Sequence, residues 1–107
     1  MKRGDLITVA PPGEYGKSRP ALVIQSDFFG EHPGMTLCLL TSDLRDAPLF
    51  RLDVPPTPAN ALRLASQIMV DKILTVPRGR AADVMGHLDP ETMMAVDRAL
   101  ALWIGLA

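Results

Sequence analysis

The feature that most constrains the fold of this chain is a series of short apolar runs, each followed by glycine, proline or charged turn residues. The runs are Leu6–Ala10, Ala21–Gln25, Met35–Leu40, Phe50–Val54, Leu64–Val70 and Ile73–Val76. Each run has the length of a β-strand, and the residues between them are typical of turns. The second run is apolar without alternation, which predicts burial on both of its faces. Short strands at this spacing indicate a small barrel or a strongly bent antiparallel sheet.

The hydrophobic period changes near the C-terminus, where the sequence predicts one helix over residues 90–106. Asp89 suits the N-cap, Pro90 suits the first helical position, and Glu91 places an acid in the first turn. One helical face then carries the apolar residues Met93, Val96, Leu100, Trp103, Ile104 and Ala107. The predicted fold is mainly β with α: a curled antiparallel sheet with one C-terminal helix packed on it.

Composition narrows the class of protein. A chain of 107 residues with 48% apolar and 21% charged residues predicts a single globular domain over residues 1–107. The net charge of -1 gives no overall attraction for nucleic acid, so a nucleic-acid site has to be a local patch. Cys38 is the one cysteine and lies in an apolar run, so it is interpreted as a buried hydrophobe; no metal or cofactor is expected. No secretory signal or membrane span is evident, which predicts a cytoplasmic protein.

Arg19 is the sharpest candidate for chemistry. It precedes Pro20, which holds its backbone extended, at the junction between a glycine-bearing loop and a buried strand. A guanidinium there offers five donors and a permanent charge, which suits a phosphate. The alternative is a surface arginine paired with Glu14 in the same loop, and the loop sequence favours neither interpretation.

Hydroxyls and further cations complete the candidate set. Thr41 and Ser42 end the third run, where they could donate to a phosphate oxygen or cap a turn. The layout of the strands can bring Arg19 and a hydroxyl to the same edge of the sheet. Tyr15 could stack a base, and a groove for a nucleic-acid backbone could be lined by Lys17, Lys72, Arg78 and Arg80. Each of these cations is, by itself, an ordinary solvated charge.

Standard catalytic signatures are otherwise missing from the sequence, which has no nucleophile elbow, no Walker loop and no paired cysteines. His32 and His87 leave a two-histidine ribonuclease as an alternative, against their interpretation as solvated loop residues.

From end to end the chain resembles the MazF/PemK toxin family. The resemblance is carried, in the family's order, by Arg3-Gly4-Asp5, Gly13-Glu14, Arg19–Ile24, Leu40-Thr41-Ser42, Asp71–Val76 and Leu88–Glu91 through Gly105-Leu106. It implies an SH3-like barrel with a C-terminal helix, assembled as a homodimer and neutralised by a cognate antitoxin. The long segments Pro11–Ser18 and Pro55–Ala61 are the expected rims of the antitoxin groove.

The resemblance also implies an activity. Members are toxins of type II toxin–antitoxin systems and act as metal-independent, sequence-specific endoribonucleases. They cut single-stranded RNA by attack of its own 2′-hydroxyl and leave a 2′,3′-cyclic phosphate and a 5′-hydroxyl. The family's catalytic arginine falls on Arg19 and its strand-end hydroxyl on Thr41. The expected RNA-binding residues are Glu14, Tyr15, Lys17, Ser42, Lys72, Thr75 and Arg78.

The chain departs from the family pattern where many members carry a second arginine and an acid. Those positions correspond here to Leu74 and Pro77, and Tyr15 stands where several members have histidine or glutamine. Two alternatives therefore stay open. One is a catalytically silent protein that still binds the antitoxin. The other is a gyrase poison of the CcdB type, which ends in Trp-Gly-Ile. Here the order is changed to Trp103-Ile104-Gly105 and two more residues follow, and Trp103 is interpreted as a core residue because it falls on the apolar helical face.

Overall fold

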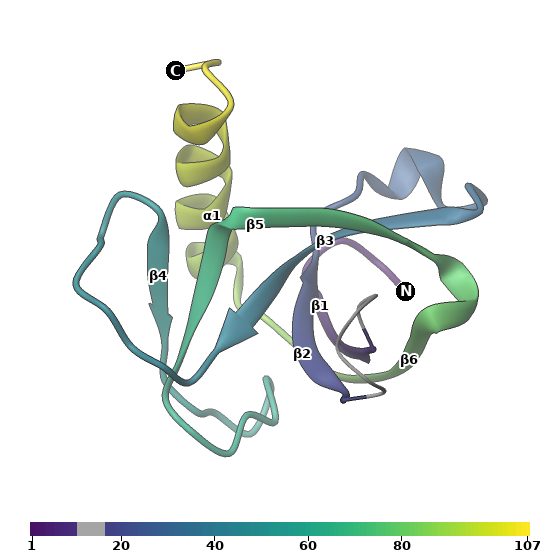
Figure 1. Cartoon of the computed structure of the whole chain (residues 1–107), viewed down its shortest axis with the longest axis horizontal. Helices are drawn as coiled ribbons and strands as arrows, with labels where there is room; N and C mark the ends of the chain where they lie inside the picture. The colour runs from purple at the N-terminus through teal and green to yellow at the C-terminus, as the bar shows by residue number, and fades with distance from the viewer. Residues whose placement is uncertain (11–16) are drawn as a thin grey trace.

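The computed structural model describes residues 1–10 and 17–107 of the chain. Within these residues the strands form one six-stranded antiparallel sheet in the order β4-β5-β3-β2-β1-β6 (Figure 1). The strands are β1 (Asp5–Val9), β2 (Arg19–Val23), β3 (Gly34–Thr41), β4 (Arg51–Val54), β5 (Ser66–Pro77) and β6 (Ala81–His87). The helices are α1 (Pro90–Trp103) and two 3-10 turns, η1 (Asp27–Phe29) and η2 (Arg78–Arg80).

The sheet curls because β5 bends sharply along its length, as Figure 1 shows. Cys38 of β3 lies opposite Ile73 of β5, whereas Leu40 lies opposite Ile68, so β5 has extra residues at this point. Such an irregularity increases the local twist and bends the strand. The first part of β5 thereby pairs with both β3 and β4, while its second part continues along β3. The predicted curled antiparallel sheet with a C-terminal helix is confirmed.

Apolar residues fill both faces of the central strands. One core cluster lies under α1 and joins Leu6, Leu22, Cys38, Leu40, Ile68 and Val70 to Val96 and Ala99 of the helix. The second cluster fills the inside of the curl and includes Ile7, Val9, Ala21, Val23, Met35, Leu37 and Val76. Neighbouring residues of β2 alternate between the two clusters, which confirms the prediction that this strand is buried on both faces.

Two strand predictions need correction. The runs Leu64–Val70 and Ile73–Val76 are not separate strands, because β5 continues through Asp71 and Lys72. The bend of β5 falls where the sequence suggested a break. Strand β6 was not predicted, because this edge strand is mostly exposed and has no apolar alternation. Its pairing with β1 holds it in the sheet.

Helix α1 begins as predicted and ends earlier. The Asp89 side chain accepts a hydrogen bond from the backbone N–H of Thr92, with 3.0 Å between nitrogen and oxygen. The helix ends at Trp103, and Gly105 takes a left-handed conformation with φ +83°. The backbone N–H of Leu106 then donates a hydrogen bond to the carbonyl of Ala101 at 2.7 Å, which caps the C-terminal end of the helix.

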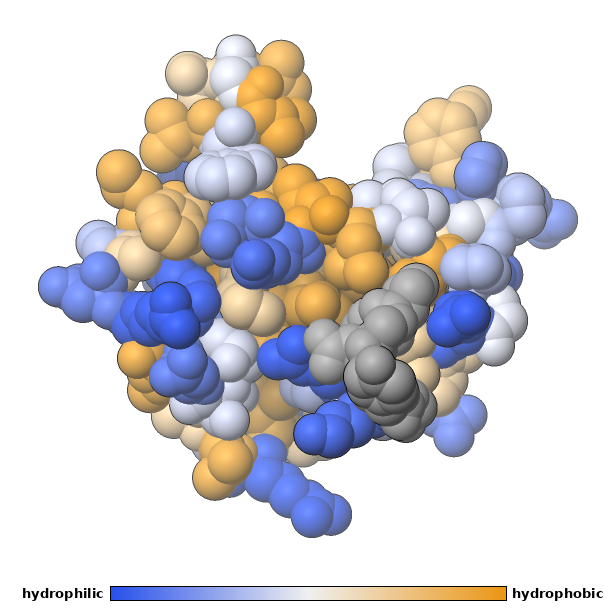
Figure 2. Space-filling model, in the orientation of Figure 1, coloured by the Kyte–Doolittle hydropathy of each residue, from blue (hydrophilic) through white to orange (hydrophobic). Residues whose placement is uncertain are grey.

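Trp103 is not a core residue, contrary to the sequence interpretation. Its side chain is 51% exposed and leans on Phe50, with 5.9 Å between the ring centroids. The helical face is buried at Val96 and Ala99 and emerges from the core toward its C-terminal end. Apolar atoms therefore gather on the surface at the free end of α1, as Figure 2 shows. In the described part of the chain, no helix has the length and apolar character needed to cross a membrane.

Candidate active site

Strand register brings Arg19 and Thr41 together at one end of the sheet. β2 and β3 run antiparallel, with Ala21 opposite Leu39 and Leu22 opposite Cys38. The pairing between the two strands ends at Ala21 and Leu39, and both strands continue from there by two residues to Arg19 and Thr41. The predicted arginine and hydroxyl therefore lie at the same end of the sheet.

Both residues line a cavity of about 390 Å³. Its size lies in the range of small-molecule and cofactor sites, which is about 300–1,000 Å³. The polar part of its wall consists of two arginines and several hydroxyls: Arg19, Arg63, Thr8, Ser18, Thr41, Ser42 and Ser66. The apolar part consists of Pro20, Leu40, Ala61, Leu62, Leu64 and Met85. Positive charge and hydroxyl donors beside an apolar wall suit a phosphate attached to a sugar and a base.

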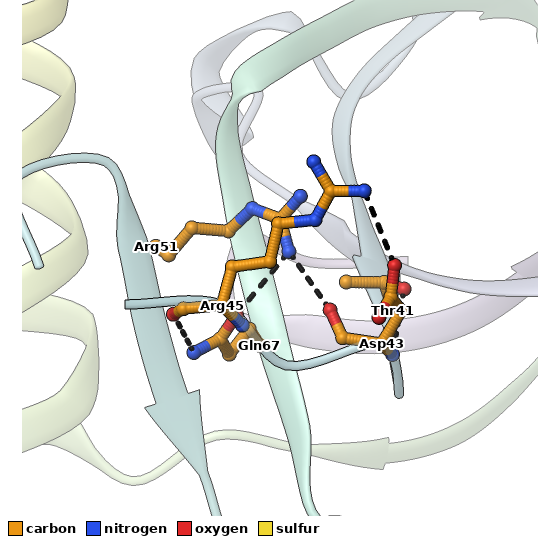
Figure 3. Close-up of polar contacts among 5 residues, drawn as sticks. All are labelled: Thr41, Asp43, Arg45, Arg51 and Gln67. Carbon is orange, nitrogen blue, oxygen red and sulfur yellow. Dashed lines mark hydrogen bonds and ion pairs between the residues drawn. The ribbon is translucent and has the colours of Figure 1, made fainter. Parts of the chain in front are cut away.

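Thr41 also anchors the loop that follows β3. Its hydroxyl oxygen accepts a hydrogen bond from the backbone N–H of Asp43, with 3.0 Å between the atoms (Figure 3). A threonine hydroxyl that accepts a bond still carries its own O–H donor. Thr41 can therefore hold the turn and donate to a ligand in the cavity.

Gln67 of the neighbouring strand β5 stabilises this loop. It is 5% exposed, and its amide oxygen accepts from the Arg45 backbone N–H at 3.0 Å and from Arg51 Nη1 at 3.2 Å (Figure 3). Its amide nitrogen donates to the Arg45 carbonyl and to Asp53 Oδ1, both at 2.9 Å. Because a buried amide with all these partners fixes its neighbours, the segment from Asp43 to Arg45 has a defined course.

Arg51 adds a second contact to the same loop. Its Nη1 donates to the carbonyl of Asp43 at 3.1 Å, while its Nε is buried and makes no hydrogen bond to the residues that the structure describes. The ion pair between Arg45 and Asp43 is 3.3 Å long and largely exposed, so it adds little stability. The loop is held by Gln67 and Arg51 rather than by this ion pair.

Several predicted RNA-binding residues lie away from the cavity. Glu14 and Tyr15 fall outside the described residues. Ser42 lines the cavity. Lys17 is exposed and comes immediately before Ser18, which lines the cavity, whereas Lys72 is exposed at the bend of β5. Of the predicted RNA-binding residues that the structure describes, Ser42 is the one that lines the cavity with Arg19 and Thr41.

Thr75 and Arg78 lie toward the other end of β3. The hydroxyl oxygens of Thr75 and Thr36 are 2.7 Å apart, and Arg78 Nε donates to the carbonyl of His32 at 2.9 Å. Thr36 is five residues before Thr41, which is about 17 Å along a strand. The structure does not bring Thr75 and Arg78 into the cavity, so an RNA contact from them stays a prediction.

The two histidines do not line the cavity either. His32 precedes β3, where its Nδ1 accepts a hydrogen bond from the Gly34 N–H at 2.9 Å, and His87 ends β6 opposite Asp5. The first of these strands is an inner strand of the sheet, whereas β6 is an edge strand. In residues 1–10 and 17–107, no group of three or more His, Cys, Asp or Glu side chains is arranged to hold a metal ion.

Cys38 is buried in the core, as predicted, and does not line the cavity. Burial, together with the nearby charge of Asp71 and against the opposing charge of Arg3, raises the pKa of its thiol to about 12. The protonated thiol therefore behaves as a small hydrophobe.

The sequence interpretation missed Arg63, Ser18, Thr8 and Ser66 as members of the cavity wall. Arg63 follows the predicted rim Pro55–Ala61, and nothing local in its sequence indicates which way this loop returns to the sheet. The return is set by contacts between segments far apart in the chain, including a hydrogen bond from the His87 N–H to the Ala59 carbonyl at 3.0 Å.

Comparison with known proteins decides the family. The family model described as "PemK-like, MazF-like toxin of type II toxin-antitoxin system" matches residues 2–104. The chain belongs to this family. A probable endoribonuclease MazF from Mycolicibacterium smegmatis is 43% identical over 108 residues, covering 100% of this chain and 99% of that protein. Endoribonuclease EndoA from Bacillus subtilis is 30% identical over 111 residues, covering 99% and 96%.

Solved structures confirm the MazF/PemK-type fold. An endoribonuclease in complex with its cognate antitoxin from a mycobacterial species aligns with a TM-score of 0.82 at 23% identity, covering 100% of this chain and 97% of that one. A MazE–MazF structure from Deinococcus radiodurans aligns with a TM-score of 0.79 at 21% identity, covering 100% and 97%. The resemblance inferred from the sequence motifs is therefore confirmed at the level of family and fold.

Proposed function

We propose that this MazF/PemK-family protein is the toxin of a type II toxin–antitoxin system and a sequence-specific endoribonuclease acting on single-stranded RNA. Two relatives that match nearly the whole chain are named endoribonucleases. The observation that carries the proposal is the placement of Arg19 and Thr41 on opposed strands in the wall of one cavity.

The proposed reaction is an internal transesterification that needs no metal ion. The RNA 2′-oxygen forms a bond to phosphorus, the bond from phosphorus to the 5′-oxygen breaks, and a proton passes to the departing 5′-oxygen. The products are a 2′,3′-cyclic phosphate and a 5′-hydroxyl. In the transition state, Arg19 would neutralise the charge that develops on the phosphorane, and the Thr41 O–H would bind a nonbridging oxygen.

Neither catalytic residue is a base near neutral pH, so another group has to accept the proton of the 2′-hydroxyl. Glu14 is the proposed base, since it is the carboxylate nearest to Arg19 in the sequence. Ser42 is proposed to contact the same phosphate as Thr41. Contacts to RNA outside the cavity are proposed for Tyr15, Lys17, Lys72, Thr75 and Arg78.

The proposed partners are a second copy of this chain and a cognate antitoxin. One structural relative is described in complex with its cognate antitoxin and another as a MazE–MazF pair, which supports the second partner. The exposed apolar end of α1 shows that the monomer has surface available for association (Figure 2). We place the activity in the cytoplasm, where single-stranded RNA is available.

The decisive experiment is cleavage of a long single-stranded RNA in the presence of EDTA. Wild-type protein should cut at recurrent short sequences and leave cyclic phosphate ends, while Arg19→Ala should lose this activity. Arg98→Ala is the matched control, because Arg98 is exposed on α1 and outside the cavity.

Intact RNA from a protein that still arrests growth would overturn the endoribonuclease proposal. The gyrase poison and the silent antitoxin-binding protein would then be separated by assaying plasmid DNA for cleavage. The half-exposed Trp103 would be the next residue to replace.

A further inference from the structure

The loop before Arg63 has a rigid and unusual construction. Asn60 is 3% exposed, and its side-chain oxygen accepts from the backbone N–H groups of Thr57 and Leu62, both at 3.0 Å. Its side-chain nitrogen donates to the carbonyl of Pro55 at 2.9 Å. One buried amide thus ties together both ends of the loop, which leaves it little freedom.

The same loop is fixed against β6 and the core. Ala59 accepts the hydrogen bond from the His87 N–H, and a Cβ on Gly86 would lie 2.5 Å from the Ala59 carbonyl oxygen. Ala61 has φ +57°, a left-handed conformation that is uncommon for alanine. Leu62 is buried in the core cluster under α1. The backbone is therefore held on both sides of the turn that leads to Arg63.

Beyond this anchored turn, Arg63 and Leu64 face solvent and line the cavity of Arg19 and Thr41. Leu64 is 63% exposed and lies next to Arg63 in the wall of the cavity. Arg63 makes no ion pair or hydrogen bond with any residue in the described part of the chain. A fixed loop that displays an uncompensated cation and an exposed aliphatic side chain is typical of a binding wall.

We propose that Arg63 is a second phosphate-binding residue of this cavity, which holds the phosphate next to the scissile one while Leu64 packs against the attached sugar or base. This inference rests on the proposed function, because it takes single-stranded RNA as the ligand. Arg19 acts on the phosphate that reacts, whereas Arg63 binds a phosphate that does not change. Arg63 therefore contributes to RNA affinity and to the position of the cut rather than to the chemical step.

The test measures binding and cleavage separately. The probe is an RNA oligonucleotide spanning a cut site mapped with the wild-type protein, with a 2′-deoxy sugar at the attacking position so that it binds without being cut. Its Kd is measured at several salt concentrations for wild type, Arg63→Ala, Arg63→Lys and the control Arg98→Ala. KM and kcat are measured for the unmodified oligonucleotide.

Arg63→Ala should raise Kd and KM by about tenfold and change kcat much less. Loss of one phosphate contact on a single strand should also reduce the slope of log K against log salt by about 0.7. Arg63→Lys should restore most of the slope, and Arg98→Ala should match wild type. Because Arg63 is exposed, thermal unfolding of Arg63→Ala should be close to that of wild type.

Different outcomes separate this inference from the proposed function. If wild type cuts RNA and Arg63→Ala keeps the wild-type Kd and salt slope, the assignment of Arg63 is wrong while the endoribonuclease stands. A loss of kcat without a change in Kd would also overturn it, since Arg63 would then act on the reacting phosphate. Absence of cleavage by wild type would overturn both.

Discussion

Thr41 lies directly opposite Gln67 where β3 pairs with β5. The same glutamine lies opposite Asp53 on its other side, where β5 pairs with β4. A buried amide thus connects the strand that ends in the candidate catalytic hydroxyl to the edge of the sheet. Its hydrogen bonds to Arg45 fix the loop that Thr41 caps, so the position of the hydroxyl depends on a residue that does not line the cavity.

Replacing Gln67 by methionine should destabilise the protein strongly. Methionine fills a similar volume but removes the four hydrogen bonds of the buried Gln67 amide, and each typically contributes about 0.5 to 1.5 kcal/mol. We expect the free energy of unfolding in urea to fall by about 2 to 4 kcal/mol. Gln25→Met is the matched control, because Gln25 is only part-buried and makes two hydrogen bonds. Equal losses from both substitutions would contradict the assigned role of Gln67.

Thr41→Val should separate the hydroxyl from the shape of the side chain. Valine keeps the volume but lacks the donor proposed to bind the nonbridging oxygen, so kcat for RNA cleavage should fall by about 100-fold. Thr41→Ser keeps both the donor and the acceptor for the Asp43 N–H, and it should retain most of the activity. Wild-type kcat in the valine variant would show that Thr41 only caps the turn.

Much of the fold could be predicted from local sequence. The apolar run of β2 indicated burial on both faces, and Asp89 with Pro90 marked the start of α1. Strand β6 could not be predicted in this way, because an exposed edge strand has no hydrophobic period. Trp103 belongs to the apolar face of α1, and the sequence therefore predicted that it is buried. The last turn of the helix extends past the core, however, so Trp103 lies at the surface.

The candidate site was likewise predictable where local sequence determines it and not where contacts between distant segments do. Arg19 and Thr41 were found from a residue before proline and a hydroxyl at a strand end, and the antiparallel course of β2 and β3 brings both into the wall of one cavity. Arg63 was missed because its position depends on Asn60 and on the β6 contact at Ala59, which join segments distant in the sequence. Thr75 and Arg78 were predicted to bind RNA in place of family residues that this chain lacks, although they lie toward the other end of β3.

Cys38 should be unreactive in the folded protein. Its pKa of about 12, caused mainly by burial, keeps the thiol protonated, whereas the unfolded chain has a thiol of ordinary pKa near 9.0. A thiol-specific reagent at pH 9 should label the urea-unfolded protein rapidly and the native protein only at the rate of unfolding. Rapid labelling under native conditions would contradict the buried position.

The same pKa difference gives the sign of a pH effect. Between about pH 9 and 12 the unfolded state gives up the Cys38 proton more readily than the folded state, so stability falls as pH rises. The slope from this group is at most about 1.4 kcal/mol per pH unit. Urea unfolding of wild type and Cys38→Ala at several alkaline pH values measures it. Parallel curves for the two proteins would contradict the predicted contribution.

Two glycines test whether the turn beside the cavity is packed as tightly as its contacts indicate. A Cβ on Gly86 would lie 2.5 Å from the Ala59 carbonyl oxygen and 2.7 Å from backbone atoms of Asn60, so the loop that carries Arg63 would have to move. A Cβ on Gly79 would meet no atom within 4 Å. Gly86→Ala should therefore lower the free energy of unfolding by about 1 to 3 kcal/mol, while Gly79→Ala should leave it nearly unchanged.

The two alanine variants should also differ in RNA binding. If Gly86→Ala stays folded at low temperature, displacement of the 59–62 backbone should weaken binding of the 2′-deoxy oligonucleotide, because the wall that displays Arg63 is no longer in place. Gly79→Ala should bind with the wild-type Kd. A folded Gly86→Ala protein with wild-type affinity would show that the exact course of this loop does not matter for the RNA. The rigid construction around Asn60 would then serve stability alone.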